Sequence, residues 1–599
     1  MAGYMKETYY ETYAQALNDY YTVDALKSIA KLICEAVPAR KADIISAIST
    51  ALHDGNLKSV FNRLSKIEQY AVAEAVFSPD GKINYKKFEA KYLAGENFDQ
   101  SLGDMSESNL LPLFIIRGQI PADIRSSLKV FVPKPKSDNV KYFEKLPQSI
   151  KPSIKGETRL ALVTRTTSQA ALMNIEAILR LIDGGKLKVS QKTGHPTSAT
   201  TKNLSKLLYE GDWYNEPEML DEIGPIQAFA WPIIIQGVGL AKADGSTLKL
   251  SNAGRKALNG NLQDVIKTAW KKWEKTKFID EFSRINEIKG QKSSRGRALT
   301  APATRRPVIN EALSQLIPGR WVKVEELIRF MRSKGFDFDV ARYAWKLYIC
   351  DVRYGSLDDY GNWSIIEGRY LLAFLFEYAA TLGLIDVAYI HPAGALPDYY
   401  DLWGIDGIDF LSRYDGLQYI RVNSLGAYVL DIADWYYPPV FKARPALKVL
   451  PNYDIVITDA VSISPADRLF LAKTCKKVSS SLWQISLKTI LDAAQSGTET
   501  EEILSFLKSR SSEKIPETVI TLLNDAKKRT TQLSYSGRAH LIECRDPILV
   551  QLISSDRKLS KMCLPAGDLF IVVLPGMEKP FINALADIGY IVPQLREQI

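Results

Sequence analysis

The last quarter of the chain is organised around the stretch Leu447-Lys-Val-Leu-Pro-Asn-Tyr-Asp-Ile-Val-Ile457. Its apolar positions 447, 449, 455 and 457 predict a strand that Pro451-Asn452 interrupts. Ser464-Pro465 then predicts the start of a helix, because serine caps free backbone N–H groups and proline fits the first helical position. A strand followed by a capped helix predicts that an α/β domain begins here.

The pattern of strands and helices continues to Val592. A strand is predicted at 482–485, Ser486 is placed to cap a helix over 487–496, and Thr498 with Glu501 has the spacing of a capping box. After the break at Lys514-Ile-Pro-Glu517, we expect a helix to residue 528, strands at 539–544 and 569–574, and a helix at 581–588. The sequence therefore predicts a C-terminal α/β domain over residues 445–599.

This order of elements resembles the N-terminal domain of XPB-type DNA helicases. The residues that carry the resemblance are Val449-Leu-Pro-Asn-Tyr-Asp-Ile-Val456, Trp483-Gln-Ile-Ser486 before a helix, and Lys514-Ile-Pro-Glu517. The resemblance implies a module that lies close to DNA or docks a partner, and that is not itself the motor. The alternative is a plain α/β module with an apolar sheet.

Length and composition set broad limits. A chain of 599 residues predicts roughly three to five domains, and 46% apolar with 24% charged residues is typical of globular proteins. No apolar run approaches the ~18 residues of a membrane span, and Met1 to Glu7 lacks an apolar signal core. The five cysteines are scattered, which is not a disulfide framework. We expect an intracellular, cytoplasmic and nucleoid-associated protein.

Positive charge is concentrated in one segment. The chain has a net charge of +9, whereas residues 249–306 contain fifteen Lys and Arg against five Asp and Glu. The excess of ten within this segment is larger than the net charge of the whole chain. A local basic excess indicates a polyanionic partner more strongly than a uniformly high pI does.

The first 100 residues are expected to be mostly helical. Three helices are predicted at 23–36, 41–53 and 57–76, followed by a turn at Pro79-Asp-Gly81. Residues 1–100 therefore form a helical module, either a winged helix or a plain helical bundle. Residues 101–155 are rich in Pro and Lys toward their end and are interpreted as a connecting segment.

A winged helix is predicted at residues 156–260. Helical patterns lead to Gly239-Leu240, and Asp244-Gly245 between apolar arms predicts a hairpin. Leu248 to Leu258 closes the module with a capped helix. The same closing unit recurs without a gap at Ile420 to Leu430, also after a Gly-Leu pair at Gly383-Leu384. This repeat predicts a second winged helix at 305–440, unless both copies are generic strand-to-helix joins.

Basic residues of these modules are the candidate DNA contacts. A winged helix places one helix in the major groove and its wing on the backbone or minor groove. The candidates lie on the predicted recognition helix, the wing, the helices after it, and the basic helix-and-loop linker at 261–304 with the start of the next module. They are Thr200, Thr201, Lys202, Lys206, Lys242, Lys249, Arg255, Lys256, Lys267, Lys271, Lys272, Lys275, Arg295, Arg297, Arg305 and Arg306. The alternative is that these residues form a solvated basic face.

Motifs for catalysis are not found. The chain has no Gly-x-x-x-x-Gly-Lys-Ser/Thr loop for nucleotide phosphates. Its four histidines have no second His or Cys at a metal-ligand spacing, except His540 and Cys544 on a predicted strand, where a core position is the better interpretation. We expect no catalytic residue, no metal and no cofactor.

These features predict an α+β multidomain protein with mainly helical winged-helix modules followed by a C-terminal α/β domain. Its architecture is similar to that of the transcription factor IIH subunit that pairs with the XPB helicase. The leading hypothesis is a non-enzymatic DNA-binding accessory protein that works with an XPB-type helicase or a DNA-processing or defence complex, docking through residues 445–599. The alternatives are a protein-interaction scaffold without DNA binding and, third, a cryptic metal-dependent nuclease.

Overall fold

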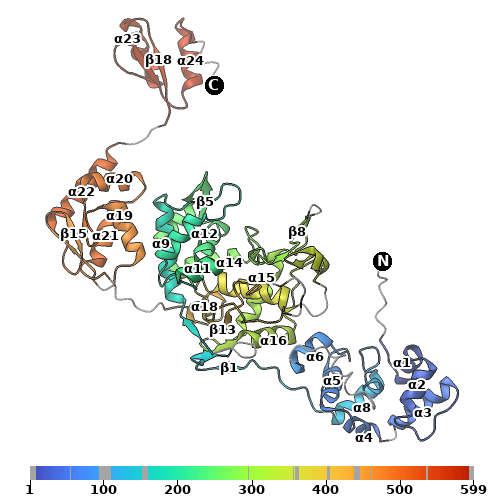
Figure 1. Cartoon of the computed structure of the whole chain (residues 1–599). Helices are drawn as coiled ribbons and strands as arrows, with labels where there is room; N and C mark the ends of the chain where they lie inside the picture. The colour runs from blue at the N-terminus through green and yellow to red at the C-terminus, as the bar shows by residue number, and fades with distance from the viewer. Residues whose placement is uncertain are drawn as a thin grey trace. The chain divides into compact units, whose positions relative to one another are not determined.

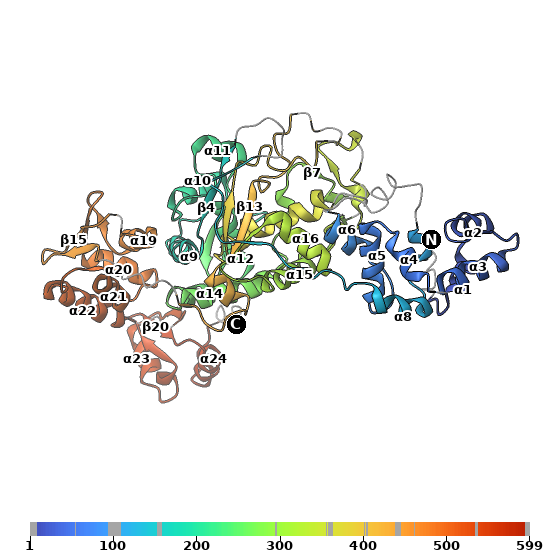
Figure 2. The same cartoon turned by 90° about the horizontal axis from the view of Figure 1, so that it is seen from below.

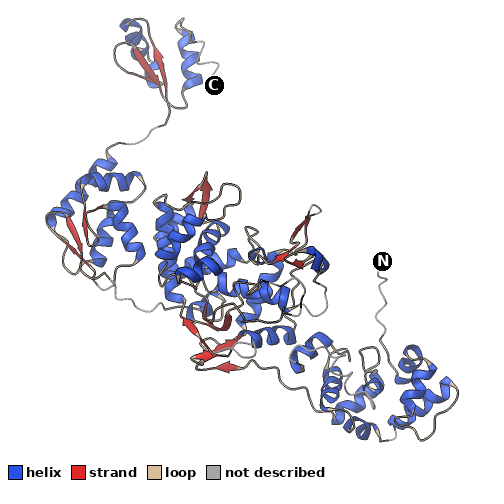
Figure 3. Ribbon diagram, viewed as in Figure 1, coloured by secondary structure: helices blue, strands red, loops and turns tan. Residues whose placement is uncertain are grey.

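The computed structural model describes two compact units (Figure 1). It covers residues 9–592 except 54, 94–109, 152–158, 294–295, 355, 358–362, 401, 403–404, 406, 438–444, 461 and 534–536. The first unit comprises residues 1–444 and 460–473, and the second comprises 445–459 and 474–599. Helices dominate both units, and the strands form small antiparallel sheets (Figure 3). The predicted α+β class is thereby confirmed.

The N-terminal residues form a helical module with its own core. Its elements are α1 (Tyr13–Tyr20), α2 (Val23–Ala30), α3 (Lys41–His53), α4 (Leu57–Asn62), α5 (Lys66–Phe77), α6 (Tyr85–Tyr92), η1 (Leu111–Leu113) and α8 (Ala122–Phe131). The helix predicted over 57–76 is two helices, because Ser65 and Glu68 form a capping box that starts α5. The turn after α5 leads into α6. Among the described residues, strand pairing at the place where a wing was considered consists of two isolated bridges, Lys82 to Gln119 and Ile116 to Gln119.

The central part of the chain contains most of the first unit. Its elements to the basic segment are β1 (Tyr142–Phe143), β2 (Ser149–Ile150), β3 (Leu160–Ala161), β4 (Val163–Arg165), α9 (Ser168–Asp183), α10 (Ser198–Leu207), α11 (Pro217–Ile223), α12 (Gln227–Gly237), β5 (Ala241–Asp244), β6 (Thr247–Leu250), α13 (Asn252–Leu258), α14 (Leu262–Trp273), η2 (Glu281–Arg284), β7 (Ile288–Lys289), β8 (Lys292–Ser293) and β9 (Gly296–Arg297).

The rest of the central part contains the second copy of the repeat. Its elements are α15 (Pro302–Ser314), β10 (Trp321–Lys323), α16 (Val324–Lys334), η3 (Ala344–Lys346), β11 (Tyr348–Ile349), η4 (Val352–Tyr354), the π-helix η5 (Ser364–Gly368), α17 (Arg369–Ala373), the π-helix η6 (Phe374–Ala379), β12 (Ile385–Tyr389), β13 (Leu417–Val422) and α18 (Ser424–Val429). Five strands form one antiparallel sheet in the order β1-β10-β13-β12-β4. Strands β4 and β13 of this sheet are labelled in Figure 2.

The two copies of the repeat have the same strand order. In the second copy, β10 pairs with β13, and β13 pairs with β12. In the first, Lys188 bridges to Thr247 of β6, and β6 pairs with β5. In both copies the strand before the second helix therefore pairs with the last strand, which lies between the other two.

The closing units also share their hydrogen bonds. Ser251 N–H donates to the Leu240 carbonyl at 3.0 Å, and Asn423 N–H donates to the Leu384 carbonyl at 3.3 Å. Each of these residues also caps the following helix, through the N–H groups of Gly254 and Gly426 respectively. The repeat predicted from the sequence is confirmed at this level.

Both copies share one hydrophobic core. Buried side chains from α9 to α18 form a single cluster, in which Trp213 stacks on Phe376 with ring centroids 5.2 Å apart. Helix α12 is buried along residues 227–235, and the π-helix η6 is buried along its whole length. The two helices contact each other, so the helix before the hairpin in one copy packs on its counterpart in the other.

The C-terminal part follows the predicted order. Its elements are β14 (Leu447–Val449), β15 (Asp454–Ile457), α19 (Pro465–Thr474), β16 (Lys476–Lys477), β17 (Leu482–Gln484), α20 (Leu487–Gln495), α21 (Thr500–Arg510), α22 (Glu517–Thr531), β18 (His540–Glu543), α23 (Pro547–Ser555), η7 (Leu559–Lys561), β19 (Cys563–Pro565), β20 (Phe570–Val573) and α24 (Glu578–Asp587). The cap of α21 is Glu499 rather than the predicted Thr498. Helix α23 and strands β16 and β19 were not predicted.

Candidate nucleic-acid interface

The hairpin β5–β6 presents lysines on one face and leucines on the other. Gly245, with φ +60°, closes its turn, and Lys242 lies directly opposite Lys249. Residues 186–189 extend along β6, because Leu248 N–H donates to the Leu187 carbonyl at 3.0 Å and Lys188 bridges to Thr247. Leu187 and Leu248 are fully buried. Successive side chains on a strand point to opposite faces, so the lysines point outward.

We call Lys186, Lys188, Lys242 and Lys249 the wing lysines. All four are exposed. Lys249 forms an ion pair with Asp244 at 2.5 Å, and the other three have no ion pair to another described residue. Like charges opposite each other on a sheet destabilise it, so this surface is suited to an anionic partner. Lys186 and Lys188 were missed in the sequence analysis, although the alternation Lys-Leu-Lys-Val at 186–189 was a signal for them.

Helix α10 does not have the predicted contact surface. Thr200 and Thr201 are each only 7% exposed, and the Thr200 hydroxyl donates to the Lys188 carbonyl at 2.8 Å. The backbone N–H of Thr200, in the first turn of α10, donates to the hydroxyl of Thr197, which caps the helix. The predicted DNA contacts at these two threonines are therefore wrong, because both hydroxyls are used inside the fold. Lys202 lies 3.7 Å from Asp221, and Lys206 is exposed.

The basic residues of α13, of α14 and of the turn after α14 divide into two groups. Lys267 and Lys271 both bind Asp431, at 2.7 and 3.0 Å, and the Lys267 ammonium lies 4.0 Å from the centroid of the Tyr428 ring. These two lysines hold α14 against the end of α18, and the carboxylate they share has a pKa below its ordinary value because both lysines donate to it. Exposed residues form the second group: Arg255, which lies 3.6 Å from Asp183, and Lys256, Lys272 and Lys275.

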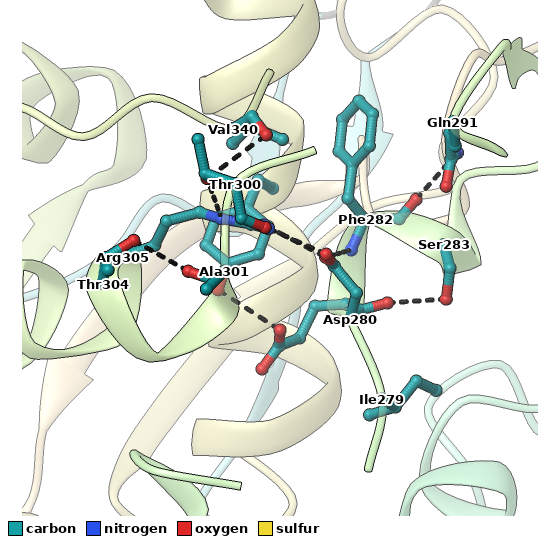
Figure 4. A network of polar contacts seen from close by, with 12 residues as sticks. Ile279, Asp280, Phe282, Ser283, Gln291, Thr300, Ala301, Thr304, Arg305 and Val340 are labelled. Atoms are coloured by element: carbon teal, nitrogen blue, oxygen red, sulfur yellow. Dashed lines mark hydrogen bonds and ion pairs between the residues drawn. The ribbon is translucent and has the colours of Figure 1, made fainter. Parts of the chain in front are cut away.

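Arg305 and Arg306 are structural residues, and their prediction as DNA contacts is wrong. Both side chains are fully buried. Arg305 donates to both carboxylate oxygens of Asp280, at 3.0 and 2.7 Å (Figure 4). Arg306 Nε donates to Glu281 at 2.6 Å and Arg306 also donates to the Trp273 carbonyl. A buried guanidinium is stable only when paired, and the adjacent acids 25 residues earlier supply the pairs.

The remaining candidates are Arg295 and Arg297. Arg295 lies outside the described residues, and Arg297 is in β9. Among the described residues no three His, Cys, Asp or Glu side chains gather as a metal-ion site. In the same residues no helix is long and apolar enough to cross a membrane.

Helix α12, and not the predicted α10, stands where a winged helix would have its recognition helix. It directly precedes the hairpin, but every residue from Gln227 to Ile235 is buried. Asp212 fixes its first turn, since its carboxylate accepts hydrogen bonds from the N–H groups of Ile226, Gln227 and Ala228. A helix buried on all sides cannot enter a DNA groove without disrupting the core. The accessible basic surface is therefore the wing and the helices beside it.

Comparison with known proteins identifies one region. Residues 452–567 match the family described as helicase conserved C-terminal domain. The matched region lies inside the part of the chain that was predicted to be a helicase-associated α/β domain, and it is helicase-related. No curated protein matches the chain.

Proposed function

We propose that this protein is a non-enzymatic nucleic-acid-binding accessory factor of a helicase or DNA-processing complex. The observation that carries the proposal is the row of wing lysines, three of which have no ion pair within the described residues. The helicase-related region at 452–567 supplies the context. The absence of a phosphate-binding loop from the sequence is consistent with an ATPase on another chain.

The proposal includes two winged helices. Each copy of the repeat has a helix, a strand, a second helix and a third helix directly before a hairpin, with the short helix α11 inserted in the first copy. In both copies the first strand is paired to the last. In this interpretation the two modules pack through their third helices, which leaves the wing of the first module to contact the ligand. Wing lysines neutralise phosphates but do not read base edges, so we expect binding to be independent of sequence.

The proposed partner is an XPB-type helicase. The resemblance of Val449 to Val456 and of Lys514 to Glu517 to the XPB N-terminal domain supports this finer statement. The helicase family match covers the first segment from residue 452 and the whole of the second. By analogy with the transcription factor IIH subunit, residues 445–599 would pair with the corresponding domain of the helicase. Cytoplasmic, nucleoid-associated localisation belongs to the same proposal.

The test is binding of labelled duplex DNA to a variant with Lys186→Gln, Lys188→Gln and Lys242→Gln. Three lost phosphate contacts should weaken binding to unrelated sequences equally and reduce the slope of log affinity against log salt by about 3. The matched control changes three exposed lysines of the N-terminal module, Lys58, Lys86 and Lys129, to Gln.

Two outcomes would contradict the proposal. If the protein binds no duplex at about 50 mM salt, the scaffold alternative replaces it, because several phosphate contacts give measurable binding at that concentration. If the control variant loses as much affinity as the wing variant, binding is a general effect of net charge. Divalent-metal-dependent cleavage of the DNA by purified protein would instead favour the nuclease alternative.

A further inference from the structure

Two exposed aromatic rings lie side by side after α16. Tyr343 and Trp345 are 42% and 54% exposed, and their ring centroids are 4.8 Å apart at an interplanar angle of 55°. Their neighbours Ala344 and Leu347 are buried, which fixes the short 3-10 helix η3 to the body of the unit. The aromatic platform, defined as Tyr343 and Trp345, is therefore held on an anchored backbone.

Basic side chains surround the aromatic platform. Lys346 Nζ lies 4.4 Å from the centroid of the Tyr343 ring, and Arg342 is exposed beside it. The loop 289–292 packs against the same segment: Lys289 pairs with Tyr348 across β7 and β11, and a Cβ added at Gly290 would collide with the carbonyl of Lys346. Lys289 and Lys292, at the two ends of this loop, are exposed as well.

Backbone hydrogen bonds keep these basic residues together. Arg342 N–H donates to the Ala298 carbonyl at 2.7 Å, and Ala298 N–H donates to the Gln291 carbonyl at 3.3 Å. Of the acids nearby, Asp351 is paired with Arg353 at 2.8 Å. Asp339 accepts a hydrogen bond from Thr300 through its backbone carbonyl, and its side chain is on the exposed side of the chain. Among the described residues of these segments, Arg342, Lys346, Lys289 and Lys292 thus stand with two acids that have no ion pair to another described residue: Asp339 and Glu287, whose carboxylate accepts from Cys350 Sγ at 3.4 Å.

We propose that the aromatic platform binds single-stranded nucleic acid. Bases inside a duplex are stacked on each other, whereas unpaired bases present free faces that stack on exposed Trp and Tyr rings. The surrounding Arg and Lys side chains suit the phosphates between such bases, and a negatively charged strand complements their charge. The inference deepens the proposed function, on which it rests, because it names a second form of nucleic acid and a surface other than the wing lysines.

The test measures the Kd of the full-length protein for a fluorescently labelled oligo-dT strand and for a duplex. Trp345→Ala should weaken oligo-dT binding by about fivefold to a hundredfold, the cost of losing one stacked base. Trp345→Phe should retain most of the affinity, since a phenyl ring still stacks. Lys346→Gln should reduce the salt slope on the single strand by about 0.7. Trp435→Ala, at a tryptophan that is 66% exposed and outside the platform, is the matched control.

The outcomes separate this inference from the proposed function. If Trp345→Ala leaves oligo-dT binding unchanged while the wing variant loses duplex binding, the platform is overturned and the wing proposal stands. If the protein binds neither strand nor duplex, both are overturned. If Trp345→Ala affects only capture of a helicase partner, the rings form a protein-docking surface and the inference is wrong. Unchanged duplex binding by Trp345→Ala is the expected result.

Discussion

Gly254 and Gly426 occupy equivalent positions in the two copies of the repeat, where a helix starts against a carbonyl. A Cβ at Gly254 would collide with the carbonyl oxygen of Leu240, and one at Gly426 with that of Leu384. Alanine is favoured over glycine in a helix by up to about 1 kcal/mol, but a backbone carbonyl cannot move aside as a side chain can. The collision with the carbonyl should therefore outweigh the gain in helix propensity, so that alanine at either position destabilises the protein.

We expect Gly254→Ala and Gly426→Ala each to lower the free energy of unfolding by about 1–3 kcal/mol. Chemical denaturation checks this. The control is Asn252→Ala, at an exposed position of the same helix α13, which should change stability by less than about 0.5 kcal/mol. Unchanged stability in both glycine variants would mean that the closing units are more deformable than their shared hydrogen bonds indicate.

Arg305 illustrates the cost of a buried charge. Its guanidinium pairs with Asp280, which is 1% exposed, and lies 4.5 Å from the Tyr370 ring centroid. Arg305→Met would remove the guanidinium that donates to both oxygens of this buried carboxylate, and we expect a loss of about 3–5 kcal/mol in denaturation experiments. The double variant Arg305→Met with Asp280→Leu should recover part of that loss. A fully additive double variant would show that the pair is not coupled.

Glu367 should make stability depend on pH. Burial raises the pKa of its carboxyl from 4.5 to about 7, with a further contribution from the Asp339 carboxylate and an opposing one from the Val340 N–H, which donates to it at 3.0 Å. A raised pKa means that between these two values the folded protein binds more protons than the unfolded chain. The contribution of this group to the free energy of unfolding therefore falls as pH rises from about 4.5 to about 7.

Glu367→Gln removes this titration. We expect the variant to gain stability relative to the parent protein as pH increases from 4.5 to 8, by at most about 3 kcal/mol, the free energy that corresponds to a pKa raised from 4.5 to about 7. Denaturation of both proteins at several pH values measures the difference. A difference that is constant with pH would show that the carboxyl titrates at its ordinary value.

Helices α12 and η6 pack on each other between the two copies of the repeat, so the copies should unfold together. Phe376 of η6 contacts Trp213 and Tyr389, with ring centroids 5.2 and 5.1 Å apart, and its carbonyl accepts a hydrogen bond from the Trp213 indole at 3.2 Å. We expect Phe376→Ala to lower stability by about 3–5 kcal/mol. Because both copies share one core, we expect a single unfolding transition by tryptophan fluorescence. In Phe376→Ala the midpoint of this one transition should shift.

The control for this experiment is Tyr437→Ala, at a ring that is 80% exposed. It should leave the transition in place. Two separate transitions, with only one of them shifted by Phe376→Ala, would show that the copies fold independently despite the shared cluster.

The positions of the helices and hairpins could be predicted from the sequence better than the burial of their side chains. The closing units were predicted because local rules set them: a cap, a glycine and an apolar periodicity at fixed spacing. The burial of α12 could not be predicted in this way, because its partner η6 lies some 140 residues later and only the fold brings them together. The prediction that Arg305 and Arg306 contact DNA was wrong for the same reason. The sequence shows the charges of the acids at 280 and 281, but only the fold shows that these acids pair with the two arginines.

At the scale of the whole molecule, net charge overstates the surface available to a polyanion. The segment 249–306 has an excess of ten positive charges, but Arg305 and Arg306 are paired in the core and Lys267 and Lys271 bind Asp431. The exposed residues that the proposal places on phosphates are fewer: the four wing lysines together with Lys256. Each phosphate neutralised contributes about −0.9 to the slope of log affinity against log salt.

Four or five contacts predict a slope of about −4 on duplex DNA, so raising salt from about 50 to 200 mM should weaken binding by about 10²–10³-fold. If the whole excess of ten charges met phosphates, the slope would be about −9 and the loss about 10⁵-fold. Anisotropy titrations at several salt concentrations separate these two values. A slope near −9 would contradict a binding surface limited to the wing lysines and Lys256, and would mean that further exposed basic residues such as Lys272 and Lys275 also contact phosphates.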